Sequence, residues 1–183
     1  IMNRFNMAKV LLGAILFTGC TDYLNDEPIG GVSEDAFFRN MNEISAGVTS
    51  IYDIWQSREY EQAMVVLGDL PSDNFAWREE SDVDAMQVET FSVTPDNKYL
   101  MSWYKLNYQG IFRANRVIKA APGVEIIMNA GNTIDFLRDY RHIYGQALFM
   151  RAFFYFKLVQ AFGGVSIQPE TFNIGDPATP RST

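Results

Sequence analysis

Cysteine and histidine are almost absent from this chain of 183 residues, which contains one of each. A single cysteine excludes an internal disulfide, and one cysteine with one histidine excludes a Cys/His zinc site formed by this chain alone. Basic residues are also scarce, since 15 Lys and Arg stand against 22 Asp and Glu and give a net charge of -7. Nucleic-acid-binding proteins usually carry a basic face, so we expect no nucleic-acid partner.

Apolar and aromatic residues are abundant. Hydrophobic residues make up 48% of the chain, charged residues 20% and aromatic residues 14%. This composition excludes a disordered tail and a coiled coil. The positions of the aromatic residues therefore carry much of the information about function.

The first 20 residues have the features of a secretion signal. Arg4 and Lys9 form a positive start, and the apolar run 10–17 is too short to cross a bilayer. The run ends in a segment that resembles a bacterial lipobox, Phe17-Thr18-Gly19-Cys20. That resemblance implies a lipoprotein signal peptide at 1–19, cleavage before Cys20, and lipid attachment to Cys20. The alternatives are an ordinary secretory signal with a chance cysteine, or a short buried helix.

Three further segments follow the signal. Residues 20–32 are polar, with Pro28 and two glycines, and predict an extended, lipid-anchored tether. Residues 33–164 predict a helical domain. Charge is uneven along the chain, with 17 acidic and four basic residues in 22–99 but five acidic and nine basic in 100–183. The two parts either attract one another within one globule or present an acidic face to a partner.

Hydrophobic spacing of three and four residues predicts an all-α fold. Ser33 is expected to cap a short turn, and residues 68–94 are expected to be irregular, with a short extended piece at Gln87–Val93. Thr94 and Pro95 have the residue types of a helix start, and Pro122-Gly123 those of a helix end. The expected helices are Met41 to about Trp55, Glu59 to Leu67, Pro95 to about Ala121, and Ile134 to Phe162. Four helices in pairs suggest stacked helical hairpins, although no 34-residue repeat is visible.

Three sets of residues resemble the RagB/SusD-type outer-membrane lipoproteins. The first is the helix 145–164, which is similar to the family form A-x-x-L-R-A-x-x-Y-F-x-L-V-x-x-F-G-G. The second is 111–118, similar to I-x-x-A-N-x-V-I. The third is an ordered set of landmarks: Cys20, the tether Tyr23–Pro28, Phe37-Phe38, Gly68–Asp73, and Pro180-Arg181-Ser182-Thr183.

The resemblance implies a function and a fold. Members of this family are nutrient-binding lipoproteins on the cell surface of Bacteroidota, where they cover a TonB-dependent, SusC-like outer-membrane transporter and capture oligosaccharides or peptides. Their fold is α-rich, with tetratricopeptide-like helix pairs, and they are much longer than this chain. The resemblance therefore implies an N-terminal, truncated portion, in which 165–183 begins a continuation. Such a fragment alone is expected to be poorly soluble.

The residues expected to bind a ligand lie in the irregular segment. Trp77 offers a flat apolar face for a sugar ring, while Asp73, Asn74 and Arg78 can hydrogen-bond hydroxyl groups. A sugar-stacking Trp at a matching distance after an L-P-x-D motif is known in the family, which supports this choice. The alternative is that Trp77 packs down as a cover over the helices.

Other candidates are assigned structural positions. Trp55 and Trp103 lie on apolar helical faces and are expected in the core. Arg151 is expected to form a buried ion pair, and His142 to lie on the surface. Asp82 and Asp84 lack the EF-hand pattern, so we expect no metal and no cofactor.

The sequence favours a binding or docking function over an enzymatic one. No pair of carboxylates is marked out by its surroundings for glycoside hydrolysis, so we expect no enzymatic activity. The first function is a surface lipoprotein that binds oligosaccharide for a transporter. The second is a helical scaffold that only docks the transporter and binds no ligand.

Overall fold

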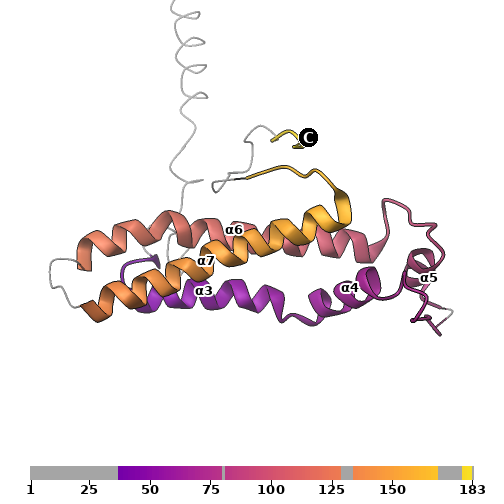
Figure 1. Ribbon diagram of the computed structural model, residues 1–183, viewed down its shortest axis with the longest axis horizontal. Helices are drawn as coiled ribbons and strands as arrows, with labels where there is room; N and C mark the ends of the chain where they lie inside the picture. The colour runs from indigo at the N-terminus through magenta and orange to yellow at the C-terminus, as the bar shows by residue number, and fades with distance from the viewer. Residues whose placement is uncertain (1–36, 80, 129–133, 169–178, 183) are drawn as a thin grey trace, which may run out of the picture. The chain divides into compact units, whose positions relative to one another are not determined.

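Two long antiparallel helices, α6 (Lys98–Met128) and α7 (Ile134–Phe162), form the framework of the fold. Helices α3 (Met41–Trp55) and α4 (Arg58–Gly68) follow one another along this hairpin, and α5 (Val83–Glu89) lies at one end (Figure 1). The computed structural model describes residues 37–79, 81–128, 134–168 and 179–182. Within these residues the fold is helical apart from loops and one isolated bridge, so the predicted all-α class is confirmed.

Several predictions fall on residues that the structure does not describe. They are the signal peptide 1–19, the lipid-attachment residue Cys20, the tether 20–32 and the cap Ser33. All of these lie outside the described residues and stay predictions. Residues 37–183 form one compact unit.

Local sequence signals place the helix starts. The side chain of Asn40 accepts a hydrogen bond from the backbone N–H of Glu43 at 3.1 Å and begins α3. Ser57 accepts one from Tyr60 at 3.3 Å and begins α4. Such caps satisfy N–H groups that have no partner within the helix. The predicted bounds of α3 and α7 are confirmed, and those of α4 are correct to within one residue.

The extended piece predicted at Gln87–Val93 is wrong, because the chain forms α5 there. Asp82 caps this helix by accepting a hydrogen bond from the backbone N–H of Ala85. Ala85 and Val88, three residues apart, are both buried. Two apolar positions at helical spacing are too few to predict a helix when the segment also contains β-branched residues, which favour strands.

Both predicted ends of α6 are also wrong. The helix begins at Lys98 rather than Pro95, because the side chain of Asn97 accepts hydrogen bonds from the N–H groups of Tyr99 and Leu100. At the other end, Pro122 lies inside the helix, which continues to Met128. Proline removes one backbone hydrogen bond but fixes a φ that suits a helix. Pro122 and Gly123 are both exposed, and α6 passes through them without ending.

The core lies between α3, α4, α6 and α7. A methyl group on Gly110 of α6 would overlap the ring of Phe154 on α7, so the absence of a side chain allows the two helices to approach closely. Trp103 is buried at 5% exposure, as predicted, whereas Trp55 is 45% exposed and its predicted core position is wrong. Trp55 is the last residue of α3, so its ring lies at the rim, edge-on to Phe153. Fully buried side chains include Ile44, Ile51, Tyr60, Val66, Ile111, Val117, Phe154 and Leu158.

The end of α7 is closed by residues far along the chain. Gly163 has a φ of 69°, which suits glycine at a helix C-terminus. The Arg181 guanidinium donates to the carbonyl oxygens of Phe162 and Gly164, and Ser182 bonds to Val165. A Cβ on Gly164 would collide with the carbonyl oxygen of Ser182. The two landmarks Phe162–Gly164 and 180–182 therefore form one unit. In the described part of the chain, no helix is long and apolar enough to cross a membrane.

Candidate functional site

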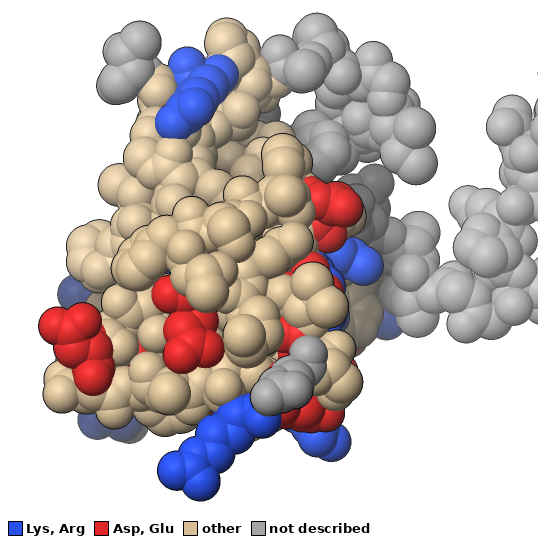
Figure 2. All heavy atoms as spheres, turned by 90° about the vertical axis from the view of Figure 1, so that its right-hand side faces the viewer, with Lys and Arg blue, Asp and Glu red and all other residues tan. Residues whose placement is uncertain are grey.

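The candidate site lies at the end of the bundle that carries α5. Three segments meet there: the loop 69–82, α5 itself, and the loop 90–97 that leads into α6. Residues 75–79 have no regular secondary structure. Figure 2 looks onto this end and shows acidic groups spread over a largely uncharged surface. The described acidic residues in these segments are Asp69, Asp73, Glu79, Asp82, Asp84, Glu89 and Asp96.

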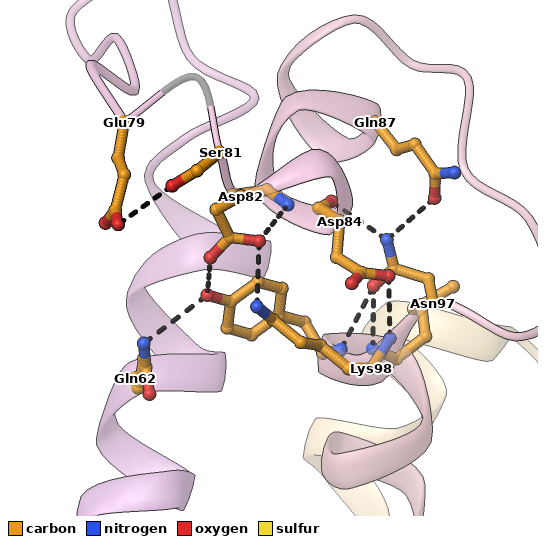
Figure 3. Close-up of polar contacts among 11 residues, drawn as sticks. Gln62, Glu79, Ser81, Asp82, Asp84, Gln87, Asn97 and Lys98 are labelled. Atoms are coloured by element: carbon orange, nitrogen blue, oxygen red, sulfur yellow. Dashed lines mark hydrogen bonds and ion pairs between the residues drawn. The ribbon is translucent and has the colours of Figure 1, made fainter.

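A polar cluster around Asp82 fastens this end to the bundle. The Asp82 carboxylate lies 2.8 Å from Lys98 Nζ and accepts a hydrogen bond of 2.6 Å from the Tyr99 hydroxyl. Gln62 of α4 donates to the same hydroxyl at 3.3 Å. We call these four residues, Asp82, Lys98, Tyr99 and Gln62, the Asp82 clamp (Figure 3). The clamp joins the loop before α5 to α4 and α6.

The electrostatics of the clamp favour an ionised carboxylate. Burial opposes ionisation of Asp82, but hydrogen bonds from Lys98, Tyr99 and the Ala85 backbone outweigh burial and lower its pKa. The hydrogen bond to Asp82 raises the pKa of Lys98. Burial, followed by the Asp82 contact, raises the pKa of Tyr99. At neutral pH the clamp is therefore a charged pair with a neutral tyrosine.

A second set of hydrogen bonds holds α5 against the start of α6. The Asn97 amide, which is buried, donates to the Asp84 carbonyl oxygen at 2.9 Å and to Gln87 Oε1 at 3.0 Å. The Asp84 carboxylate accepts from the Lys98 backbone N–H at 3.1 Å. Figure 3 shows these contacts next to the Asp82 clamp. Together they fasten a loop-rich end to the bundle through polar contacts.

Trp77 is half-buried and packs against the hydrophobic core. Its backbone N–H donates to Glu89 Oε2 at 3.3 Å, which ties this part of the loop to the last residue of α5. The indole Nε1 is shielded from solvent and has no hydrogen-bond partner among the described residues. Much of the Trp77 ring therefore acts as a cover for the helices, and the exposed remainder is what a ligand can reach.

The other predicted ligand residues accompany Trp77 at the surface. Asp73, Asn74 and Arg78 are all exposed in the same loop. Carboxylate, amide and guanidinium groups in such positions can bind hydroxyl groups from solvent. These residues share one loop with Trp77, and their role in ligand binding stays a prediction.

Sequence reasoning missed both the clamp and the exposed apolar side chains of this end. Phe91 is 77% exposed, Val83 64% and Phe75 46%. A sequence signal for the clamp existed, since Asp82 precedes a short run with apolar residues three apart, as a helix cap does. No sequence signal shows that the Phe91 ring is left in solvent.

A groove of about 790 Å³ lies beside the site, between the start of α6 and the end of α7. Its walls include Pro95, Met101, Tyr104 and Phe162, and Tyr104 packs edge-on against Phe162. Trp77 is not part of it. This groove is thus a second place where a ligand can meet an aromatic side chain.

Two remaining residues occupy structural positions. Arg151 is half-buried and donates to Asn115 of α6 at 3.1 Å, which joins the two helical sequence motifs. Arg151 thus has a partner on a neighbouring helix, and its predicted ion pair with an acid stays a prediction. His142 is exposed, as predicted. Within the described residues, no group of three or more His, Cys, Asp or Glu is placed to hold a metal ion.

The fold and the site define a class of protein: an α-helical bundle with a loop-built end that carries aromatic and polar side chains. Comparison with known families is consistent with this class. Residues 22–183 match the model of the SusD-like family, described as starch-binding and associating with the outer membrane. The chain belongs to this family.

Two curated relatives from Formosa agariphila are similar to the chain. SusD-like protein P38 is 24% identical over 176 residues, which are 95% of this chain and 32% of the relative. SusD-like protein P2 is 24% identical over 169 residues, or 90% of this chain and 31% of the relative. The chain spans about a third of the length of these relatives. No solved structure matches the chain significantly.

Proposed function

We propose that this chain is part of a cell-surface lipoprotein that binds oligosaccharides and passes them to a TonB-dependent, SusC-like outer-membrane transporter. The observation that carries the proposal is the family match over residues 22–183, because that family is described as starch-binding and outer-membrane-associated. The proposed lipid anchor is Cys20, after removal of a signal peptide at 1–19 and before a tether at 20–32. Binding without catalysis is the proposed activity.

The ligand site is proposed at the α5 end, with Trp77 as the ring contact and Asp73, Asn74 and Arg78 as hydroxyl contacts. Sugar rings have an apolar C–H face, and burying roughly 80 Å² of it contributes about 2 kcal/mol. The clamp around Asp82 supports the site by holding its loop in one conformation, which lowers the entropy lost on binding.

Affinity electrophoresis tests the ligand site directly. The purified full chain is run in native gels containing amylopectin, laminarin, xylan or pectin. At least one of these glycans is expected to retard the wild type, and Trp77→Ala is expected to weaken that retention about tenfold. Tyr104→Ala in the neighbouring groove is the matched control and should keep wild-type retention. If the two variants exchange behaviour, the ligand lies in the groove and the proposed site is wrong.

The anchor has its own test. Cells are labelled with radioactive palmitate, and the wild type is compared with Cys20→Ala. Labelling is expected in the wild type alone, because Cys20 is the only cysteine. Equal labelling of both chains would contradict lipid attachment at Cys20.

A second function, a scaffold that docks the transporter without binding a ligand, is favoured by one observation. The Trp77 ring is packed against the core, so only part of it is available to a sugar. Co-purification with the adjacent transporter, combined with no retention by any glycan, would support this scaffold instead.

A further inference from the structure

Phe91 occupies a position that is unfavourable in two independent ways. Its backbone φ is 55°, in the left-handed region that bulky residues rarely adopt. Its side chain is also 77% exposed, so no burial offsets the backbone strain. It is the one described non-glycine residue with a positive φ. Backbone outliers of this kind concentrate at functional sites.

The local hydrogen bonds explain how this conformation is held. Phe91 follows the C-terminus of α5, where its N–H donates to the Val88 carbonyl oxygen at 3.2 Å. The next N–H, of Ser92, donates to the Gln87 carbonyl oxygen at 2.9 Å. This pair of bonds is the Schellman motif, whose left-handed position is usually glycine. A glycine would close α5 with less strain, so the stability of the helix end does not explain a phenylalanine.

Phe91 lies close in the chain to a residue that contacts the loop of the proposed site. The Trp77 backbone is hydrogen-bonded to Glu89, and Phe91 is two residues beyond Glu89, at most about 7 Å along the chain. The neighbours of Phe91 in the chain are polar: Glu89 carries a carboxylate, and the hydroxyl groups of Thr90 and Ser92 lie 2.9 Å apart. An exposed ring among hydroxyl and carboxylate groups is suited to the mixed apolar and polar surface of a sugar.

We infer that Phe91 is a second ring contact of the glycan site, so that the site extends from Trp77 past the end of α5. Two ring contacts separated along the surface select an oligosaccharide over a single sugar. This inference rests on the proposed glycan-binding function, and it adds a residue and a minimum ligand length. The motif at the end of α5 fixes the Phe91 backbone and so presents the ring before the ligand arrives.

The matched variants Phe91→Gly and Phe91→Ala separate the ring from the backbone. Both remove the ring, so both are expected to weaken glycan retention about tenfold in the affinity gels described above. Only glycine relieves the strain, so Phe91→Gly should melt about 2–4 °C above Phe91→Ala. Phe91→Trp is expected to keep wild-type retention. Phe149→Ala removes an exposed ring from α7, where Phe149 is 65% exposed, and should leave retention unchanged.

The outcomes distinguish this inference from the proposed function. If Trp77→Ala weakens retention and Phe91→Gly does not, the second contact is wrong and the glycan-binding function stands. If no glycan retards the wild type, both are wrong. If Phe91→Gly loses co-purification with the transporter but keeps glycan retention, the ring contacts a protein partner and the inference is overturned.

Discussion

The bundle and the α5 end are held together by different forces. Between α6 and α7 the packing is apolar and close, and at Gly110 the helices approach so closely that a methyl group would not fit. At the α5 end, charged and amide groups around Asp82 and Asn97 replace most of that packing. Apolar packing supplies stability, whereas the polar contacts fix a loop while leaving its aromatic residues accessible. The difference explains how one chain combines a stable support with a loop-built end whose aromatic side chains are partly exposed.

Tyr60 links the two regions. Its ring is fully buried and contacts the rings of Trp103 and Phe154. Its buried hydroxyl donates a hydrogen bond to Asn107 Oδ1 at 3.1 Å. Burial raises the pKa of Tyr60, so the side chain stays neutral and keeps this hydrogen bond throughout the physiological pH range. Tyr60 lies only two residues before Gln62 of the clamp, so the packed core continues directly into the polar end.

The largest expected effect comes from breaking the apolar packing. Gly110→Ala places a methyl group in the Phe154 ring, and overpacking of this kind typically costs about 1–3 kcal/mol. Thermal unfolding followed by circular dichroism should show a clear loss of stability. Gly145→Ala on α7 is the control, because nothing lies within 4 Å of the added methyl group and alanine favours a helix. A Gly110→Ala chain as stable as Gly145→Ala would contradict the close contact.

A smaller and more local effect is expected from breaking the clamp. Asp82→Ala removes the Lys98 ion pair, the Tyr99 hydrogen bond and the cap of α5, at a cost of about 1–2 kcal/mol. The loss should appear as faster hydrogen exchange in residues 71–93, with α7 unchanged. The control Asp73→Ala changes an exposed carboxylate of the same loop and should leave exchange unaltered. Uniformly faster exchange in the Asp82→Ala chain would mean that the two regions are one cooperative unit.

The smallest of these effects is expected from acid, which should speed hydrogen exchange at the α5 end. Near neutral pH we expect no change. The folded-state pKa of Asp82 lies below its unfolded value of about 3.9, so its contribution to stability is present above that pH. The contribution is lost as the pH falls through the folded-state pKa. Hydrogen exchange of 71–93, corrected for the intrinsic rate, should therefore rise only below about pH 4.

A control separates Asp82 from its neighbours in this acid response. The pKa of Asp96 is also lowered, chiefly by a hydrogen bond from Thr94. Asp82→Asn should remove most of the acid dependence, whereas Asp96→Asn should leave it in place. The opposite result would assign the acid response to Asp96.

The presence of the long helices was predictable from sequence, and the structure of the α5 end was not. Helices α3 and α7 have many apolar residues at helical spacing, so their bounds follow from sequence alone. At the α5 end the decisive contacts join residues such as Asp82 and Lys98, which are far apart in sequence and polar in character. Pro122 shows another limit, because α6 continues through a Pro-Gly pair of the residue types that commonly follow a helix end. For the proposed site, sequence reasoning selected the loop of Trp77, whose role in binding stays a prediction, and missed the clamp and the exposed Phe91 ring.

Hydrogen exchange with and without glycan tests the central claim, that the α5 end binds the ligand. The full chain is compared alone and with soluble oligosaccharides prepared from whichever polysaccharide retards it most in native gels. The account predicts slower exchange in residues 71–93, which carry Trp77 and Phe91, and no change in 145–160 of α7. Protection of α7 or of the groove at Tyr104, with 71–93 unchanged, would contradict it.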